Sequence, residues 1–462
     1  MTAALRSSSG VDAGGILLVV ATILVFILPA LIYFPPMLPS KTEALLQTHT
    51  PIGLHPSRSG LRSGRAKRTS AGKDSAGPAK LRSLWVYPIK SCKGIEVSRS
   101  KVLSTGLEFD RLYTFCQLKS PFPVGVNTSD AEKSQHKWEF ITQRQFPLLA
   151  TIEVDLFVPD VAKTRGLEDA TGESFIVFRF PWVEKGLFGT FQWLVAKLGR
   201  GWHALPEKEV LLPVSFPAQE EIDARGYTFE DMSIWRDPVT ALNMEAELPR
   251  ELRLYLGVSN RLGIFRIDPA RFRPVYRCAP KEYDAGYQPC IGFQDAYPLH
   301  LLNLASVRDL ETIVAKDEQL QHLDPRRFRA NIITNNAVST LPVDDAPAYN
   351  EETWKAIRFH PVDPSTTTGN GDSPRFHVSC RTVRCKLPNV DQDTGLRHPV
   401  EPDRSLRKFR NVDPGAKHNG CLGMQLTPLF DETSESGGME TWLEVGMGVD
   451  VLSTGEHVYI AY

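Results

Sequence analysis

The chain has 462 residues, of which 42% are hydrophobic, and a formal net charge of −1. This length and apolar content suffice for two or three domains with proper cores, which excludes a chain that is disordered throughout. The near-neutral charge, without a basic block interleaved with aromatic residues, excludes nucleic acid as an expected partner. The seven cysteines are spread too thinly for a disulfide framework, so we expect a reducing compartment for the main domain.

The N-terminal part predicts a membrane anchor. After a short segment, residues 1–12, an uncharged and almost wholly apolar run extends from Ala13 to Phe34. This is about the length needed to cross ~30 Å of hydrocarbon, so we predict a single transmembrane helix over residues 13–34. A cleaved signal peptide is the alternative, but no Ala-x-Ala-like site precedes Pro35-Pro36.

Residues 35–80 predict a flexible basic tether. They are rich in Ser, Gly and Pro, show no apolar period, and carry many more basic than acidic side chains. By the positive-inside rule, the large C-terminal part then faces the cytosol.

Residues 81–230 predict a small antiparallel β-barrel. Short β-type runs, such as Leu84–Tyr87 and Ala150–Leu156, are punctuated by Gly and Pro at suitable intervals. Residues 120–137 and 182–207 are predicted as insertions, and the second contains an amphipathic helix around residues 191–195.

Residues 231–462 predict a second β-rich domain with flanking helices. A helix is expected from Glu247 to Gly257, and another is expected after Pro298 through Leu302 to Ile313, with Ser306 starting a capping box that divides it. Later strand-like runs alternate with Gly-rich turns, so the expected fold class is α+β and rich in β-barrel.

Cys385 is the candidate chemical centre. It lies between Arg384 and Lys386, ahead of an Asp-x-Asp-Thr-Gly turn at residues 391–395. Nearby positive charge lowers a thiol pKa and favours the thiolate, which is the metal-binding form. The alternative is a buried cysteine that acts only as a small hydrophobic side chain.

Several cations and polar groups could hold an anion. Lys90 and Ser91 follow a predicted strand, where an ammonium and a hydroxyl could both meet a phosphate oxygen, although a solvated turn explains them equally. Arg111, in an Asp-Arg pair, has a surface ion pair as its alternative. Arg329 lies in an apolar β-type run and must be paired or contact a ligand, and Asn331 would share its face.

In order and spacing these stretches resemble the MOSC family, specifically its two-part, amidoxime-reducing members, from about Leu81 to the C-terminus. The matching positions are Tyr87, Pro88, Lys90 and Ser91; Asp110 and Arg111; Thr142, Arg144 and Pro147; Phe293, Asp295 and Ala296; Phe328, Arg329 and Asn331; and Arg384 and Cys385. The chain departs from the family pattern at Ala330, at Val383, and at Pro388-Asn389. The loss of a hydroxyl at Val383 removes one expected hydrogen bond near the metal.

The resemblance implies an N-terminal MOSC β-barrel domain, a C-terminal MOSC domain, and one molybdenum-molybdopterin cofactor. It implies that Cys385 binds the metal and, with Asp295, is catalytic. The implied cofactor-binding residues are Lys90, Ser91, Arg111, Arg144, Arg329, Asn331 and Arg384.

The implied reaction is the two-electron reduction of a small N-hydroxylated compound. Because the sequence contains no NAD or flavin fingerprint, electrons must come from another protein. The resemblance implies a membrane-bound b-type cytochrome and its NADH-dependent reductase. It also favours the mitochondrial outer membrane, with the endoplasmic reticulum as the alternative.

Three other functions stay open. A non-catalytic carrier of the cofactor would keep the same residues. A structural zinc site could use Cys380 and Cys385 with His398, His418 or Cys421, although the spacing is unusual for zinc. A relative of cofactor sulfurases would need a large pyridoxal-phosphate domain, for which the chain before Leu81 has no room.

Overall fold

The fold is known from a computed structural model. It describes residues 13–33, 40–61, 79–120, 129, 131, 135–165, 172–235, 237–335, 348–361, 373–430 and 439–460. The chain divides into two compact units, one made of Met1–Ala44 and Phe180–Glu209 and the other of Leu45–Arg179 and Val210–Tyr462. Most of the predicted insertion 120–137 lies outside the described residues.

The first closed barrel has the strand order β11-β12-β13-β6-β7. Its strands are β6 (Tyr113–Lys119), β7 (Lys137–Phe140), β11 (Thr228–Ile234), β12 (Asp237–Asn243) and β13 (Arg261–Arg266). A parallel pairing of β11 with β7, with Met232 opposite Trp138, completes the ring. Trp138, Phe140, Phe265 and Phe293 fill its core.

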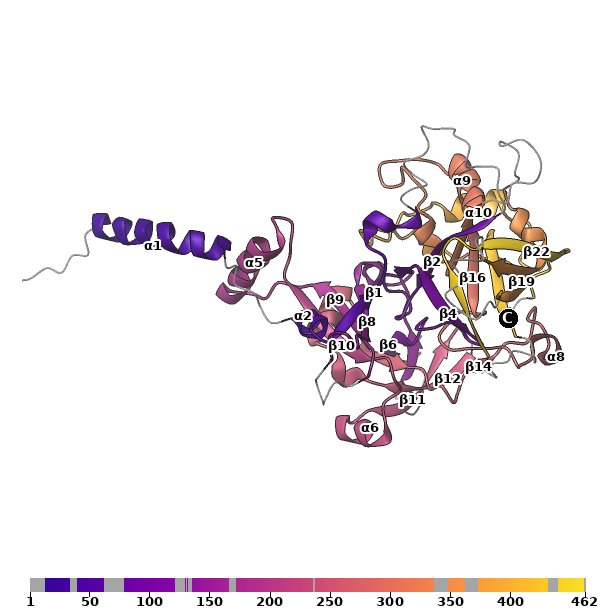
Figure 1. Ribbon diagram of the computed structural model, residues 1–462, viewed down its shortest axis with the longest axis horizontal. Coiled ribbons are helices and arrows are strands. Elements are labelled where there is room, and N and C mark those ends of the chain that lie inside the picture. Colours follow the sequence, from indigo (N-terminus) through magenta and orange to yellow (C-terminus); the bar gives the residue numbers. More distant parts are fainter. Residues whose placement is uncertain are drawn as a thin grey trace, which may run out of the picture. The chain divides into compact units, whose positions relative to one another are not determined.

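The second barrel follows the order β17-β16-β20-β19-β18-β22-β2, and pairing of β2 with β17 closes it; β3 adds to its edge. Its strands are β2 (Lys80–Val86), β3 (Ile95–Val97), β16 (Leu299–Asn303), β17 (Ile332–Asn335), β18 (Trp354–His360), β19 (Arg375–Val383), β20 (Cys421–Leu429) and β22 (Gly448–Thr454). The closing pair places Leu84 opposite Ile332. Strands β2, β16, β19 and β22 of this barrel lie together in Figure 1. The pairing of β2 with β17 brings the Tyr87 stretch, which follows β2, close to the Arg329 stretch, which precedes β17.

Smaller sheets complete the β structure. One has the order β1-β8-β9-β10, another β21-β4-β5, and a third pairs β14 with β15. Their bounds are β1 (His49–Ile52), β4 (Arg99–Leu103), β5 (Gly106–Leu107), β8 (Glu153–Pro159), β9 (Phe175–Pro181), β10 (Glu207–Pro213), β14 (Arg273–Pro274), β15 (Cys290–Ile291) and β21 (Glu440–Glu444). Two closed barrels with short helices confirm the expected β-barrel-rich α+β class.

The helices are short apart from α1 and α5. They are α1 (Ala13–Tyr33), α2 (Lys41–Leu46), α5 (Leu187–Arg200), α6 (Gln219–Arg225), α7 (Arg250–Leu256), α8 (Glu282–Ala285), α9 (Leu304–Ile313) and α10 (Asp403–Phe409). Helix α7 ends as predicted at Gly257, whose φ of 69° is a left-handed conformation that glycine adopts without strain. Helix α5 confirms the amphipathic helix predicted in the insertion 182–207.

The predicted helix after Pro298 is wrong at its start. Leu299–Asn303 forms strand β16, because these residues are wholly buried and pair with strands on both sides. The helix begins only at Leu304, where the Asn303 side chain accepts a hydrogen bond from the backbone N–H of Ala305. Ser306 does not cap a second helix, since its hydroxyl donates to the buried Glu351 carboxylate at 2.6 Å.

The segment predicted as a transmembrane anchor is helical over Ala13–Tyr33. Within the described part of the chain, however, no helix combines the length and hydropathy that crossing a membrane requires. The prediction of a single-pass anchor is therefore not supported.

Candidate functional site

Two arginines from distant parts of the chain stack on one buried tyrosine. Tyr87 follows the last residue of β2, and its ring centroid lies 4.6 Å from the guanidinium carbon of Arg111 and 4.3 Å from that of Arg329. The Tyr87 hydroxyl donates to the carbonyl of Ala330 at 3.2 Å, and burial raises its pKa to about 12. Two like charges gathered on one buried ring create a strongly positive environment that favours an anion.

The backbone around these groups is unusual. Six non-glycine residues in the described ranges have positive φ, and four of them belong to this site: Ser91, Arg111, Trp235 and Arg329, with φ of 68°, 53°, 56° and 52°. Such conformations cost about 1–3 kcal/mol each and persist where surrounding structure enforces them, often at functional sites. The strain is thus concentrated at three of the predicted cofactor-binding residues and one neighbour.

Arg329 does not lie in a strand as predicted. It ends the 3-10 helix η5 (Pro325–Phe328), and β17 begins only at Ile332, so the positive φ turns its side chain out of the strand pattern. Its Nη1 lies 3.4 Å from the side-chain oxygen of Gln392, while its buried Nη2 has no hydrogen-bond partner within the described structure. Desolvation lowers the pKa of Arg329 to about 10. A buried cationic donor without a protein acceptor is what an absent anionic ligand would leave.

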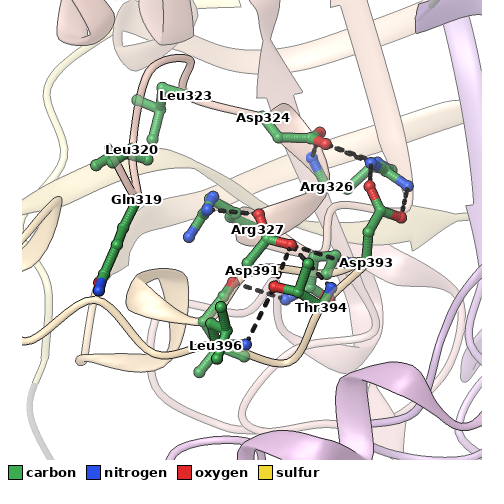
Figure 2. Close-up of polar contacts among 12 residues, drawn as sticks. Gln319, Leu320, Leu323, Asp324, Arg326, Arg327, Asp391, Asp393, Thr394 and Leu396 are labelled. Carbon is green, nitrogen blue, oxygen red and sulfur yellow. Dashed lines mark hydrogen bonds and ion pairs between the residues drawn. The ribbon is translucent and has the colours of Figure 1, made fainter. Parts of the chain in front are cut away.

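A clamp of ion pairs fixes the turn that carries Arg329. Arg326 donates to Asp324 and to both oxygens of Asp393, at 2.9 and 2.6 Å, and Arg327 donates to Asp391 at 2.7 Å (Figure 2). Asp391 also accepts from the backbone N–H and hydroxyl of Thr394. The Asp-x-Asp-Thr-Gly turn therefore holds the Arg329 turn in place.

Asn331 ties the Tyr87 and Arg111 stretches to the second barrel. Its side-chain oxygen accepts from Arg111 Nη1 at 3.1 Å, and its Nδ2 donates to the carbonyl of Trp85 at 3.1 Å. The Asp110 carboxylate accepts from the backbone N–H of Tyr87 at 2.9 Å and also binds Arg111. Asn331 thus orients Arg111.

Lys90 and Asp295 form the next part of the site. The buried Lys90 ammonium lies 2.6 Å from Asp295 Oδ1 and 2.7 Å from the carbonyl of Phe293. Desolvation lowers the pKa of Lys90, although Asp295 counteracts it. Desolvation also opposes ionisation of Asp295, yet Lys90 outweighs it and holds the carboxyl pKa at about 2. Because the Asp295 side chain is 59% exposed, this carboxylate stays accessible to an incoming molecule.

Trp235 is a site residue that the sequence analysis missed. It lies between β11 and β12, its indole N–H donates to Asp295 at 3.1 Å, and the guanidinium carbon of Arg144 lies 4.7 Å from its ring centroid. A Trp in a polar turn carries no motif of its own. Only the folded barrel reveals its place next to Asp295.

An amide pair joins the two sequence halves beneath Ser91. Gln143 and Gln392 exchange side-chain hydrogen bonds of 3.2 and 3.0 Å, and Gln143 also donates to the carbonyl of Ser91 at 2.8 Å. Beside Gln143, the hydroxyl of Thr142 is buried without a partner in the described structure. It is a second polar atom that a bound group could satisfy.

Cys385 follows β19 in a partly buried loop. The expectation of a lowered thiol pKa is wrong in this structure, although the flanking Arg384 acts in the expected direction. Burial raises the pKa, and the charge of Asp295 raises it further, which together outweigh a backbone N–H at Leu387 and the cations Arg144 and Arg384.

Arg384 packs beneath this cysteine loop with its guanidinium bound to protein. It donates to the carbonyls of Leu422 and Phe328 at 2.9 and 3.2 Å, and its Nη2 lies 2.5 Å from Nε2 of His300. Desolvation lowers the pKa of Arg384 to about 10. The pKa of His300 is also lowered, well below its usual range, mainly by desolvation and next by the charge of Arg384. His300, also missed from the sequence, thus acts as a neutral acceptor.

The zinc alternative gains no support. Among the described residues, no group of three or more His, Cys, Asp or Glu side chains could hold a metal ion. Cys380 is fully buried in an apolar cluster with Val275 and Tyr297. The site instead offers one partly buried thiol, several cations, and unsatisfied buried polar atoms on Arg329 and Thr142. These groups fit an anionic cofactor that binds its metal through a single cysteine.

The sequence matches two family descriptions. Residues 78–174 match the MOSC N-terminal beta barrel domain, and residues 289–449 match the MOSC domain. These ranges contain nearly all of the site, including both stacked arginines and Cys385.

Relatives from several animals are named mitochondrial amidoxime reducing component 1 or 2. Mitochondrial amidoxime reducing component 2 of Rattus norvegicus is 22% identical over 348 residues, which cover 75% of this chain and 76% of the relative. The protein of that name from Bos taurus is 28% identical over 337 residues, 72% of this chain and 73% of the relative. Component 1 of Danio rerio is 31% identical over 137 residues, 30% of this chain and 34% of the relative.

Proposed function

We propose that this chain, which belongs to the MOSC family, is a molybdenum-cofactor-dependent oxidoreductase that reduces N-hydroxylated compounds. The relatives are named for amidoxime reduction, and an amidoxime contains the N–O bond that such a reaction removes. The two family matches support a role connected with the molybdenum cofactor.

The observation that carries the proposal is the pair of arginines on Tyr87. Arg111 and Arg329 come from different halves of the chain, and both are held in strained backbone conformations against one buried ring. The unsatisfied Arg329 Nη2 supplies a charge-assisted hydrogen bond to a phosphate oxygen. We assign these two arginines, with Lys90 and Ser91, to the phosphate and pterin of the cofactor.

Cys385 and Asp295 are assigned to the reacting end of the site. A thiolate is the soft ligand that suits molybdenum, and metal binding itself removes the thiol proton whose loss burial otherwise opposes. When bound, the cofactor supplies the redox metal that accepts the oxygen of the substrate's N–O bond. Asp295, ionised beside Lys90 and more than half exposed, binds and orients a protonated amidine-like group.

Three other assignments concern positioning. Arg144 with Trp235 forms a polar aromatic wall next to Asp295. Arg384 and Asn331 hold the backbone that carries Cys385 and the Tyr87 stretch. Their side-chain bonds to protein support this role more than direct contact with the cofactor.

Electrons are proposed to come from a b-type cytochrome supplied by an NADH-dependent reductase. The sequence lacks a fingerprint for binding NAD or flavin, so a redox partner is required by the chemistry. The relatives' names favour a mitochondrial location. The outer membrane, with the endoplasmic reticulum as the alternative, stays a prediction.

Turnover with a chemical reductant tests the proposal without a partner protein. The purified chain, produced in cells that make the cofactor, is given benzamidoxime and reduced methyl viologen, and amidine formation is followed. We expect turnover by the wild type and none by Cys385→Ala, while Cys290→Ala, which alters another partly exposed cysteine, stays active.

Two outcomes would contradict this function. A wild type that holds molybdenum and pterin but produces no amidine would be a cofactor carrier. Full activity of Cys385→Ala would remove the metal ligand assignment and with it the proposed chemistry.

A further inference from the structure

Helix α5 of the insertion 182–207 presents an apolar stripe to solvent. The stripe consists of Leu187, Phe191, Leu194 and Leu198, spaced i, i+4, i+7 and i+11, which places them on one helix face. Their side chains are 41–91% exposed, and Phe188 at the stripe's edge is 60% exposed. Gly189 and Ala196 on the opposite face are buried, as is Val195 on the flank of the stripe.

Aromatic and cationic side chains border the stripe. The Lys197 ammonium lies 4.7 Å from the ring centroid of Trp193 and 4.9 Å from that of Trp202, which is 75% exposed. Lys185 and Arg200 stand at the two ends of the helix. Trp rings with a lysine stem beside an apolar face are typical of groups at a lipid headgroup boundary.

Two acids near the helix are paired with neighbouring cations. Glu207 pairs with Arg200 at 2.7 Å, and Glu184 pairs with Lys208 at 2.7 Å. Lys197 contacts two aromatic rings and a backbone carbonyl, so its ammonium group and that of the exposed Lys185 set the local charge. The face is therefore complementary to an anionic surface.

We propose that α5 is a membrane-surface element that lies in the headgroup region of an anionic bilayer, with its apolar stripe toward the acyl chains. Its 14 residues extend about 21 Å, well short of ~30 Å of hydrocarbon, so the helix lies along the surface. This inference does not rest on the proposed reductase function, because none of its residues belongs to the catalytic site.

Vesicle binding by the full chain tests the proposal. The probe is phosphatidylcholine vesicles with about one-third phosphatidylserine, compared with pure phosphatidylcholine. We expect the double variant Phe191→Asp, Leu194→Asp to bind the anionic vesicles at least about tenfold more weakly, because burying each side chain is favourable. Val161→Asp, which makes the same change at another strongly exposed apolar position, is the control and keeps full binding.

Fluorescence quenching locates the helix on the bilayer. Brominated acyl chains should quench tryptophan emission of the wild type, and Trp202→Phe should remove a large part of that quenching. Unchanged vesicle binding in the double variant, or unchanged quenching in Trp202→Phe, would overturn the proposal. Concentration-dependent self-association that the double variant abolishes without any effect on vesicles would assign the stripe to a second copy of the chain instead.

Discussion

Two buried arginines, Arg329 and Arg384, have similar electrostatics and different partners. Desolvation lowers the pKa of each to about 10. All three guanidinium nitrogens of Arg384 donate, to two carbonyls and to His300. Arg329 instead has a buried Nη2 without an acceptor among the described protein atoms. Burial of a charge therefore does not by itself identify a binding residue, and of these two arginines only Arg329 keeps a buried donor for a ligand.

The largest expected effect is on stability, at Arg384. Arg384→Ala leaves the carbonyls of Leu422 and Phe328 and the His300 ring without their donor, so we expect the free energy of unfolding to fall by about 3 kcal/mol. Denaturant or thermal unfolding measures this loss. As a control, Arg358→Ala removes an exposed ion pair with Asp450 and should cost under about 1 kcal/mol.

Equal stability losses for Arg384→Ala and Arg358→Ala would show that the buried network contributes little. The contrast between the two buried arginines would then have no energetic basis.

The second effect is on ligand retention, at Arg329. Arg329→Ala removes a charge-assisted hydrogen bond, so we expect cofactor retention to fall about tenfold or more, with little loss of stability. Arg329→Gly should lose the cofactor equally. Its free energy of unfolding should exceed that of Arg329→Ala by about 1 kcal/mol, because glycine adopts a φ of 52° without strain. A variant that retains the cofactor fully would place the anion elsewhere.

Stability should also depend on pH through His300, whose ring lies against the Arg384 guanidinium. Its folded pKa is depressed, so below the unfolded value of about 6.5 the unfolded chain binds more protons than the folded chain. This contribution to stability is present above that pH and is lost as pH falls. His300→Gln should therefore show a smaller drop in stability between about pH 7.5 and 5.5.

The exposed His55 offers a matched control for this comparison. His55→Gln should keep the wild-type pH dependence. If His300→Gln also kept it, the ring would not be held neutral by its surroundings.

The smallest effect is expected at the clamp beneath Arg329. Asp391→Ala removes the ion pair of Arg327, which keeps only its bonds to the carbonyls of Pro388 and Asn389. The loop that faces the Arg329 turn is loosened, so cofactor retention should fall about threefold. Asp393→Ala, at the more exposed pair with Arg326, should change it less. Cofactor content after extensive dialysis measures both. The reverse order of the two variants would contradict the assigned clamp.

The sequence predicts the cations and the cysteine as site residues but does not predict how they are arranged. Lys90, Arg111 and Arg329 were predicted as an anion clamp, and the structure brings Arg111 and Arg329 onto one ring while Lys90 pairs with Asp295. The positive φ of Arg329 could not be foreseen, because the apolar residues around it are equally typical of a strand.

Other parts of the site have no local pattern to read. Trp235, His300 and the Gln143–Gln392 pair take their roles from contacts between segments far apart in sequence. The thiol pKa of Cys385 was misjudged because adjacent charges are visible in a sequence and burial is not. Residue types therefore predict which chemistry is available, and folding decides which groups remain free for it.

Arg111, Arg329 and Cys385 are proposed to hold one molybdenum cofactor together. This assignment is tested most directly by measuring molybdenum and pterin together in the purified full chain, produced in cells that make the cofactor. We predict stoichiometric amounts of both in the wild type, loss of both in Arg329→Ala, and retention of both in the control Arg358→Ala. A wild type without molybdenum or pterin, or an Arg329→Ala variant that holds as much of both as the wild type, would contradict the account.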